Sequence, residues 1–144
     1  MDEFESLFMG QQMKKLCELQ YEELMKKYSL RQIELEILYF LGKSSALRVA
    51  KEIVDNWNVS KAHVSKSIEH LREGGYLNVT KSQEDYRLTH LEITEKGKSL
   101  VREIARCKNN VSHILYKGVT REEKEVLLQV AVKMKTNISM ELRK

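Results

Sequence analysis

Apolar residues recur at steps of three and four along the first part of the chain, a pattern typical of helices that bury one side. The first predicted helix covers residues 4–28, with an apolar stripe of Phe4, Leu7, Phe8, Leu16, Leu19, Leu24 and Met25. A second is predicted to start at Ser29, which forms a capping-box pattern with Gln32, and to stop at Gly42. A third covers roughly residues 47–57, with Ala50, Ile53, Val54 and Trp57 on its buried side.

Residues 58–75 predict a short helix with well-marked ends. Ser60 is a favourable N-cap residue, and Val59 before it can pack against Val64. Val64, Ile68 and Leu71 then share one face. The Gly74–Gly75 pair ends the helix, because glycine adopts the left-handed conformation at little cost.

After the two glycines the apolar period changes to two, which indicates strands. One strand holds Tyr76, Leu77 and Val79, and a second holds Leu88, Leu91 and Ile93. Residues 81–87 between them are polar and charged, and this loop is too long for a two-residue turn. The segment therefore predicts a β-hairpin with a polar tip.

Two more amphipathic helices follow the hairpin. Thr94 caps the first, which ends before Gly118 and carries Leu100, Ile104, Cys107, Val111, Ile114 and Leu115 on one side. Thr120 and Glu123 form a second capping-box pattern, and Val126, Leu127, Val130, Met134 and Ile138 form the stripe of the last helix.

This order of elements predicts a mainly α fold with a small β-hairpin wing (α+β), the winged helix-turn-helix. We expect a single domain over residues 1–144, with residues 30–97 as its DNA-binding lobe. Residues 4–28 and 98–141 are surplus to such a lobe, and their apolar stripes need a covering surface. A two-fold partner would supply it, so we interpret them as dimerisation helices.

Composition narrows the class of protein. Hydrophobic residues make up 42% and charged residues 32%, which is ordinary for a globular protein and too apolar for a disordered one. No run is apolar enough for a membrane-spanning helix, and the acidic start does not fit a secretory signal. Two cysteines 90 residues apart form no disulfide framework, so a cytoplasmic setting is expected. The net charge of +4 is small, so positive charge must be clustered before it indicates nucleic acid.

The outer face of the Ser60 helix is the first candidate site. Opposite its buried face lie Ala62, His63, Lys66, Glu69, His70 and Glu73, flanked by Lys61, Ser65 and Ser67. The start of this face has small, hydroxyl and cationic side chains and no acid, as an element entering a major groove requires. The alternative is a solvated helix face with two lysines.

The hairpin loop is the second candidate. It ends in Asp85-Tyr86-Arg87, and an arginine at a wing tip can enter a narrow minor groove. Asp85 could orient Arg87, or pair with Lys66 or His70. A charged tip alone is more often just a turn, but helix and hairpin in this order are more specific than either alone.

With these residues the sequence resembles the MarR (multiple antibiotic resistance regulator) family of bacterial transcription regulators, over nearly the whole chain. The resemblance rests on Val59-Ser60, Val64, Leu71, Gly75 and Tyr76-Leu77, then on Asp85-x-Arg87 eight residues ahead of Ile93-Thr94 and on Lys96-Gly97. It implies a dimer formed by the terminal helices, minor-groove insertion of Arg87, and recognition-helix contacts from Ala62, His63, Lys66 and His70. At positions 63 and 70 this sequence has histidine where the family more often has serine or arginine. The DNA sequence that family members recognise therefore cannot be assigned to this chain.

The resemblance also implies a cleft for a small, often aromatic, acid between the dimer helices and the winged lobe. Arg31, Tyr21, Tyr39 and Trp57 are candidates to line it, although each also has a simpler core or surface interpretation. Some relatives sense peroxide through a first-helix cysteine. Here Leu30 aligns with the tyrosine that those sensors use, so we interpret Cys17 as a small buried hydrophobe.

The sequence indicates neither an enzyme nor a metalloprotein. The four histidines have no ligand spacing with each other or with a cysteine, and no phosphate-binding loop, dinucleotide fingerprint or nucleophile elbow is present. No cofactor, metal or membrane partner is expected.

The predicted function is a sequence-specific regulator of transcription, expected to act as a repressor. It would bind double-stranded DNA as a homodimer, at a pseudo-palindromic operator with half-sites roughly 34–36 Å apart. The predicted DNA-binding residues are Ser60, Lys61, Ala62, His63, Ser65, Lys66, Ser67, His70, Asp85 and Arg87. Because imidazoles gain a proton near pH 6, binding through His63 and His70 would strengthen as the pH falls. The alternative is a winged-helix module that binds protein and not DNA.

Overall fold

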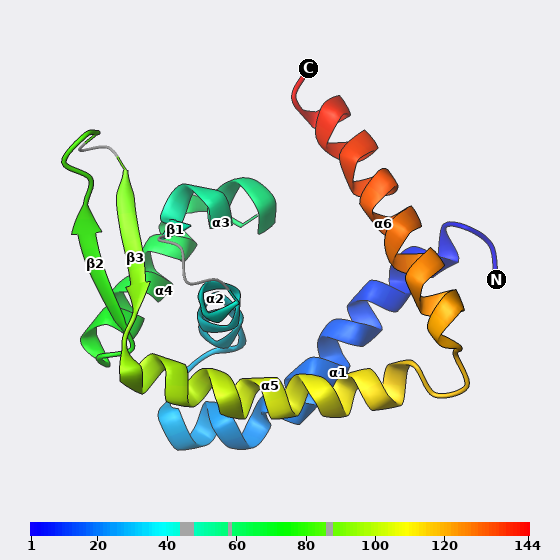
Figure 1. Ribbon diagram of the computed structural model, residues 1–144, viewed down its shortest axis with the longest axis horizontal. Helices are drawn as coiled ribbons and strands as arrows, with labels where there is room; N and C mark the ends of the chain where they lie inside the picture. Colours follow the sequence, from blue (N-terminus) through cyan, green and yellow to red (C-terminus); the bar gives the residue numbers. More distant parts are fainter. Residues whose placement is uncertain (44–47, 58, 86–87) are drawn as a thin grey trace. The chain divides into compact units, whose positions relative to one another are not determined.

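The computed structural model describes residues 1–43, 48–57, 59–85 and 88–144 (Figure 1). The chain divides into two compact units, Met1–Asn109 and Asn110–Lys144. The first unit contains the described helices and strands before α5 (Glu95–Leu115) together with most of α5, and it holds the candidate site. The second contains the end of α5 and the whole of α6 (Arg121–Leu142).

The first unit begins with α1 (Glu5–Tyr28) and α2 (Gln32–Gly42). The expectation that Ser29 caps the second helix is wrong. Ser29 instead ends α1 in the left-handed conformation, with φ of 53°, and this reverses the chain so that Leu30 N–H bonds back to the carbonyl of Met25 at 3.2 Å. Arg31 is consequently the N-cap of α2, and its backbone N–H donates to the Glu34 carboxylate at 3.0 Å.

The third predicted helix starts later than its periodicity suggests. Arg48–Val49 form a short strand, β1, and the helix α3 covers Ala50–Trp57. Strand β1 pairs antiparallel with β3 (Thr89–Ile93), with Val49 opposite His90. A two-residue strand has no periodicity of its own, and only the open edge of β3 makes these residues extended.

The capped helix and the hairpin form as predicted. Helix α4 covers Lys61–Glu73, and the Ser60 hydroxyl accepts the backbone N–H of His63 at 3.1 Å. The helix ends at Gly74, and Gly75 has φ of +80°. Strand β2 (Leu77–Lys81) pairs antiparallel with β3, and the sheet order is β1-β3-β2.

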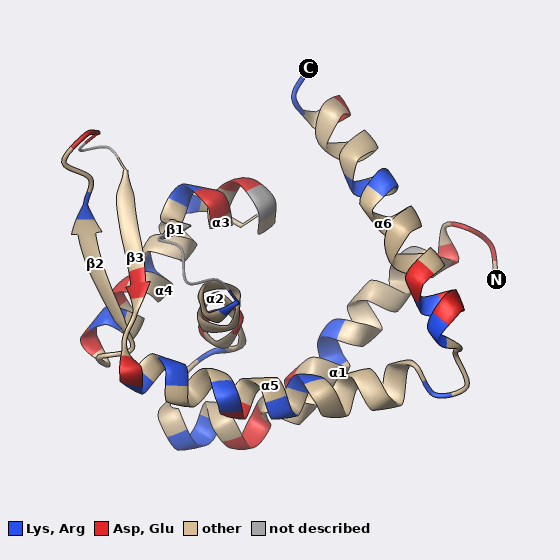
Figure 2. Cartoon of the chain, viewed as in Figure 1, with Lys and Arg blue, Asp and Glu red and all other residues tan. Residues whose placement is uncertain are grey.

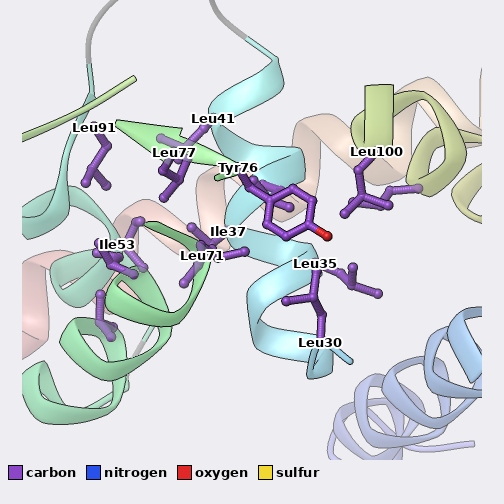
Figure 3. Close-up of a cluster of buried hydrophobic side chains, with 14 of the residues drawn as sticks. Leu30, Leu35, Ile37, Leu41, Ile53, Leu71, Tyr76, Leu77, Leu91 and Leu100 are labelled. Carbon is purple, nitrogen blue, oxygen red and sulfur yellow. The ribbon is translucent and has the colours of Figure 1, made fainter. Parts of the chain in front are cut away.

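Helix α2 lies at the centre of the hydrophobic core. Side chains from this helix, α3, α4, the hairpin and α5 meet in one cluster (Figure 3). The most deeply buried, each at most 2% exposed, are Tyr21 of α1 and Leu35, Ile37, Leu38, Ile53, Val64, Leu71, Leu77, Leu91, Leu100 and Ile104. Burial stabilises the fold by about 1.5–3 kcal/mol for each such side chain, which fixes the inner face of α4 and so directs the opposite face outward.

Helix α5 (Glu95–Leu115) begins close to the residues that end α4. The Thr94 hydroxyl accepts the N–H of Gly97 at 3.1 Å and donates to the carbonyl of Gly75 at 2.7 Å. A Cβ on Gly97 would lie 2.4 Å from the carbonyl oxygen of Tyr76, so this position requires glycine. Further along α5, Glu103 accepts a hydrogen bond from the Tyr28 hydroxyl at the end of α1.

The second unit ends with α6 (Arg121–Leu142), which begins at the predicted Thr120 cap. No residue of α6 is buried. Its predicted stripe, made of Val126, Leu127, Val130, Met134 and Ile138, is 45–58% exposed. This stripe is therefore uncovered in the single chain. Over the described residues, no helix has the length and apolar character needed to cross a membrane.

Candidate nucleic-acid interface

The N-terminal half of α4 presents an acid-free outer surface. Lys61, Ala62, His63, Ser65 and Lys66 are all exposed, and the first turn contains no acidic residue. The N-terminal end of a helix also carries the positive end of its dipole. Neither lysine forms an ion pair with any residue in the described ranges, so both ammonium groups are available to an external anion.

The second half of α4 is chemically different. Glu69 accepts hydrogen bonds from the guanidinium of Arg72, with the Nε–Oε2 distance at 2.9 Å. This contact lowers the pKa of Glu69 and raises the pKa of Arg72, so the acid carries its charge beside a matched cation. The two acids of this half, Glu69 and Glu73, lie away from the helix start, as the sequence predicts.

One predicted DNA-binding residue is buried, and another has one ring nitrogen bound to a neighbouring helix. Ser67 is 4% exposed, so its hydroxyl is withdrawn from any surface that a duplex could reach. His70 keeps a side chain 49% exposed, but its Nδ1 contacts the carboxylate of Glu34 in α2. The sequence placed both residues on or beside the outer face, because helical periodicity does not show which neighbouring helix lies against its margin.

The hairpin loop is closed by its own hydrogen bonds. Ser82 Oγ accepts the backbone N–H groups of Glu84 and Asp85, each at 3.2 Å, and Leu88 N–H donates to the carbonyl of Asp85 at 2.9 Å. Asp85 is partly buried. Figure 2 shows the acidic loop above the basic end of β2, which is Lys81. Arg87, the predicted minor-groove residue, lies outside the described residues.

The start of α4 lies beside the hairpin. A hollow of about 330 Å³ is lined by residues from α3, α4 and the hairpin: Ala50, Lys51, Val54, Asp55, Lys61, Val64, Ser65, Leu88 and Thr89. Lys61 and Ser65 thus border the same space as the first two residues after the loop. The acid-free half of α4 and the hairpin therefore flank one surface of the first unit.

Comparison with known proteins shows what this lobe is similar to. The sequence profile of the winged helix DNA-binding domain family matches residues 30–97. In the winged helix fold, α4 holds the position of the recognition helix and the β2–β3 hairpin holds that of the wing.

Two curated proteins are similar in sequence. The transcriptional repressor MprA of Escherichia coli (strain K12) is 29% identical over 75 residues, which cover 52% of this chain and 43% of MprA. The uncharacterized HTH-type transcriptional regulator YdgJ of Bacillus subtilis (strain 168) is 23% identical over 138 residues, which cover 96% of this chain and 82% of YdgJ. This chain thus spans less than half of the length of MprA. Both relatives are described as regulators of transcription.

The fold is that of MarR family structures. A Listeria monocytogenes protein described as a MarR family transcriptional regulator, solved with a 26-mer DNA, matches with a TM-score of 0.83 and 21% identity. The match covers 98% of this chain and 91% of that protein. The MarR resemblance and the mainly α winged helix fold predicted from the sequence are confirmed.

A second hollow lies on the other side of the start of the recognition helix. It measures about 590 Å³ and is lined by residues of α1, α2, the end of α3, the start of α4 and α5: Gly10, Met13, Lys14, Cys17, Arg31, Gln32, Ile33, Glu36, Trp57, Val59, His63 and Lys108. Arg31 and Trp57 line it as expected. The expectation is wrong for Tyr21, which is fully buried and donates to Glu36 at 2.9 Å.

Lys108 is the important lining residue that the sequence reasoning missed. Its ammonium lies 2.9 Å from Glu36 and 4.5 Å from the centre of the Tyr39 ring. A signal was present, because residue 108 lies four positions after Ile104 and three before Val111, on the apolar stripe of α5. A lysine inside such a stripe indicates a charged group held against the core.

The cysteines have the surroundings of packed side chains. Cys17 and Cys107 are free and partly buried. Burial raises the pKa of both thiols, and Lys108 offsets this effect in part at Cys17. A thiol with a raised pKa is a weaker nucleophile, which agrees with the interpretation of Cys17 as a small hydrophobe.

Proposed function

We propose that this chain is a transcriptional regulator that binds a pseudo-palindromic site in double-stranded DNA as a homodimer. The observation that carries the proposal is the surface shared by the acid-free half of the recognition helix and the wing. A major groove admits a helix, and a hairpin beside that helix can reach the adjacent minor groove or backbone.

The residues of this surface divide by chemistry. The free ammonium groups of Lys61 and Lys66 suit phosphate oxygens, and Ser60 orients the first turn through its cap. Ala62, His63 and Ser65 are exposed short side chains able to approach base edges. For the wing, the MarR resemblance implies minor-groove insertion of Arg87, and Asp85 remains a candidate to orient Arg87 or to pair with Lys66 or His70. Ser67 is left out because it is buried.

The comparisons support the same function. The similar Listeria monocytogenes structure contains a 26-mer DNA, and MprA is a repressor. We therefore propose repression as the mode of action.

The homodimer is proposed from the uncovered apolar stripes at both ends of the chain. Phe4 and Phe8 of the N-terminal region are 67% and 63% exposed, and the whole stripe of α6 is uncovered. Contiguous apolar surface of this kind marks an interface, and two-fold self-association is its commonest form. A symmetric pair of recognition helices then matches half-sites separated by about one DNA turn.

A small acid is the proposed effector of the 590 Å³ hollow. Arg31 and Lys14 bring cations to its lining, and Lys108 brings a third that is paired with Glu36 of the same lining. Met13, Ile33 and Trp57 bring apolar surface. This combination suits an aromatic carboxylate. His63 lines the same hollow, so an occupant would touch the recognition helix directly.

Selection of bound sites from random duplexes tests the proposed function, followed by gel retardation of the selected site across a salt series. We expect an enriched inverted repeat and a complex that survives non-specific competitor at moderate salt. The rival function, a winged-helix module that binds protein, predicts no enriched sequence and no competitor-resistant complex. That result would overturn the proposal.

A further inference from the structure

A buried carboxylate joins the recognition helix to α2. Glu34 is 1% exposed, and Glu34 and Ser67 are the two buried polar residues in the described part of the chain. Both line a hollow of about 340 Å³, whose other lining residues are Arg31, Lys66, Glu69, His70 and Glu73. A buried carboxylate is costly unless its oxygens have partners.

Both carboxylate oxygens of Glu34 have a partner. Oε1 accepts the backbone N–H of Arg31 at 3.0 Å, and Oε2 contacts Nδ1 of His70. A carboxylate can only accept hydrogen bonds, so this contact requires Nδ1 of His70 to carry a hydrogen. In a neutral imidazole the other ring nitrogen, Nε2, is then a hydrogen-bond acceptor.

The ring of His70 therefore has an inner and an outer side. Nδ1 is bound to the buried acid, while half of the side chain stays exposed beside Lys66. The cap of α2 uses only Oε1 of Glu34, so capping alone does not explain the contact between Oε2 and Nδ1 of His70. Orientation of the ring is a reason, since an apolar residue could not hold Nδ1.

We propose that Glu34 is a positioning residue that fixes the tautomer of His70, so that Nε2 faces the DNA as a hydrogen-bond acceptor. An acceptor at this place suits the exocyclic amino group of adenine or cytosine in the major groove. The inference rests on the proposed DNA-binding function and adds a specificity-determining contact to it.

Glu34→Gln separates this role from simple packing. The amide has the shape of the acid but only one acceptor oxygen, so it cannot accept from Arg31 and His70 together. With its oxygen on the Arg31 N–H, its NH₂ group faces the ring. Nδ1 must then become the acceptor, and the hydrogen moves to Nε2. Glu36→Gln is the matched control, because Glu36 lies on the same helix but binds Tyr21 and Lys108.

The first measurement is the ¹⁵N NMR pattern of the histidine rings near pH 8, with His70 assigned by its absence in His70→Asn. We expect the Nδ1–H tautomer in the unaltered protein and in Glu36→Gln, and the Nε2–H tautomer in Glu34→Gln. An Nε2–H or doubly protonated ring in the unaltered protein would overturn the inference, as would an unchanged pattern in Glu34→Gln. This measurement needs no DNA.

The second measurement is affinity for the selected DNA site and for single-base variants of it. We expect Glu34→Gln and His70→Asn each to weaken binding about tenfold and to relax one A or C position, while the double variant is no weaker than either alone. Full affinity in Glu34→Gln contradicts the inference and leaves the proposed function intact. Absence of a specific complex with the unaltered protein contradicts the proposed function, and the outward role of His70 with it.

Discussion

The hydroxyl of Ser60 accepts a 3.1 Å hydrogen bond from the backbone N–H of His63, and so closes the first turn of the recognition helix. The bond satisfies one of the four N–H groups that a helix start leaves unpaired. It also holds the first exposed residues of the DNA-facing surface in helical geometry.

Ser60→Ala should lower the free energy of unfolding by about 1 kcal/mol, because the cap is lost. Urea denaturation followed by circular dichroism measures this change. Ser65→Ala is the control, since Ser65 is exposed on the same helix and caps nothing. Equal stability of Ser60→Ala and the unaltered protein would contradict the capping role.

Lys66→Ala should reveal whether the ammonium binds phosphate or a base. A phosphate contact predicts weaker binding to all sequences and a salt slope smaller by about one counterion. A base contact predicts a loss of about 1–3 kcal/mol at one site position. Fluorescence anisotropy across a salt series distinguishes the two, with the exposed Lys26 of α1 replaced in the control. No effect of either kind would remove Lys66 from the interface.

Gly97→Ala should destabilise the winged lobe by about 3 kcal/mol, because the new methyl group would lie 2.4 Å from the Tyr76 carbonyl oxygen. Gly10→Ala in α1 is the matched control. Nothing lies within 4 Å of a Cβ at Gly10, so alanine there should stabilise the helix by about 1 kcal/mol. Relative to the unaltered protein, the unfolding temperature should fall in Gly97→Ala and rise in Gly10→Ala. A shift of the same sign in both variants would contradict the prediction.

Alkaline pH should unfold the protein in part through Tyr21. Burial raises the pKa of this hydroxyl above its ordinary value of 10, and the nearby Glu36 carboxylate adds to the effect. The folded chain therefore keeps a proton that the unfolded chain releases, and stability falls as the pH rises past about 10.

Tyr21→Phe tests this linkage. The variant should be less stable than the unaltered protein by about 1 kcal/mol at neutral pH, because the hydrogen bond to Glu36 is lost. Above about pH 10, its stability should fall less steeply than that of the unaltered protein. Denaturation at several pH values measures both effects. Tyr116→Phe is the control, since that ring contacts Lys124 and not the hydrophobic core. Parallel stability curves for Tyr21→Phe and the unaltered protein would exclude this source of alkaline sensitivity.

Val130→Glu should shift the proposed homodimer toward monomer, because it places a charge in the uncovered stripe of α6. Thr136→Glu adds the same charge to the same helix away from the stripe and should leave the assembly unchanged. Sedimentation equilibrium of both variants gives the result. A monomeric unaltered protein would refute the dimer directly.

Local chemistry determined much of this structure, and the sequence reveals that part. The Ser60 and Thr120 caps, the glycines after α4 and the change of period at the hairpin act within a few residues of themselves. Each was predictable because its physical cause lies inside one short segment. The inward face of α4 was predictable for the same reason.

Tertiary structure decided the features whose causes lie far apart in the chain. Strand β1 exists because β3 offers an edge about forty residues later. His70 turns toward Glu34, and Lys108 lies against Glu36 and Tyr39, only because packed helices bring them together. Periodicity shows which face of a helix is buried, but the partner of a side chain at the margin of that face is set by packing between distant segments.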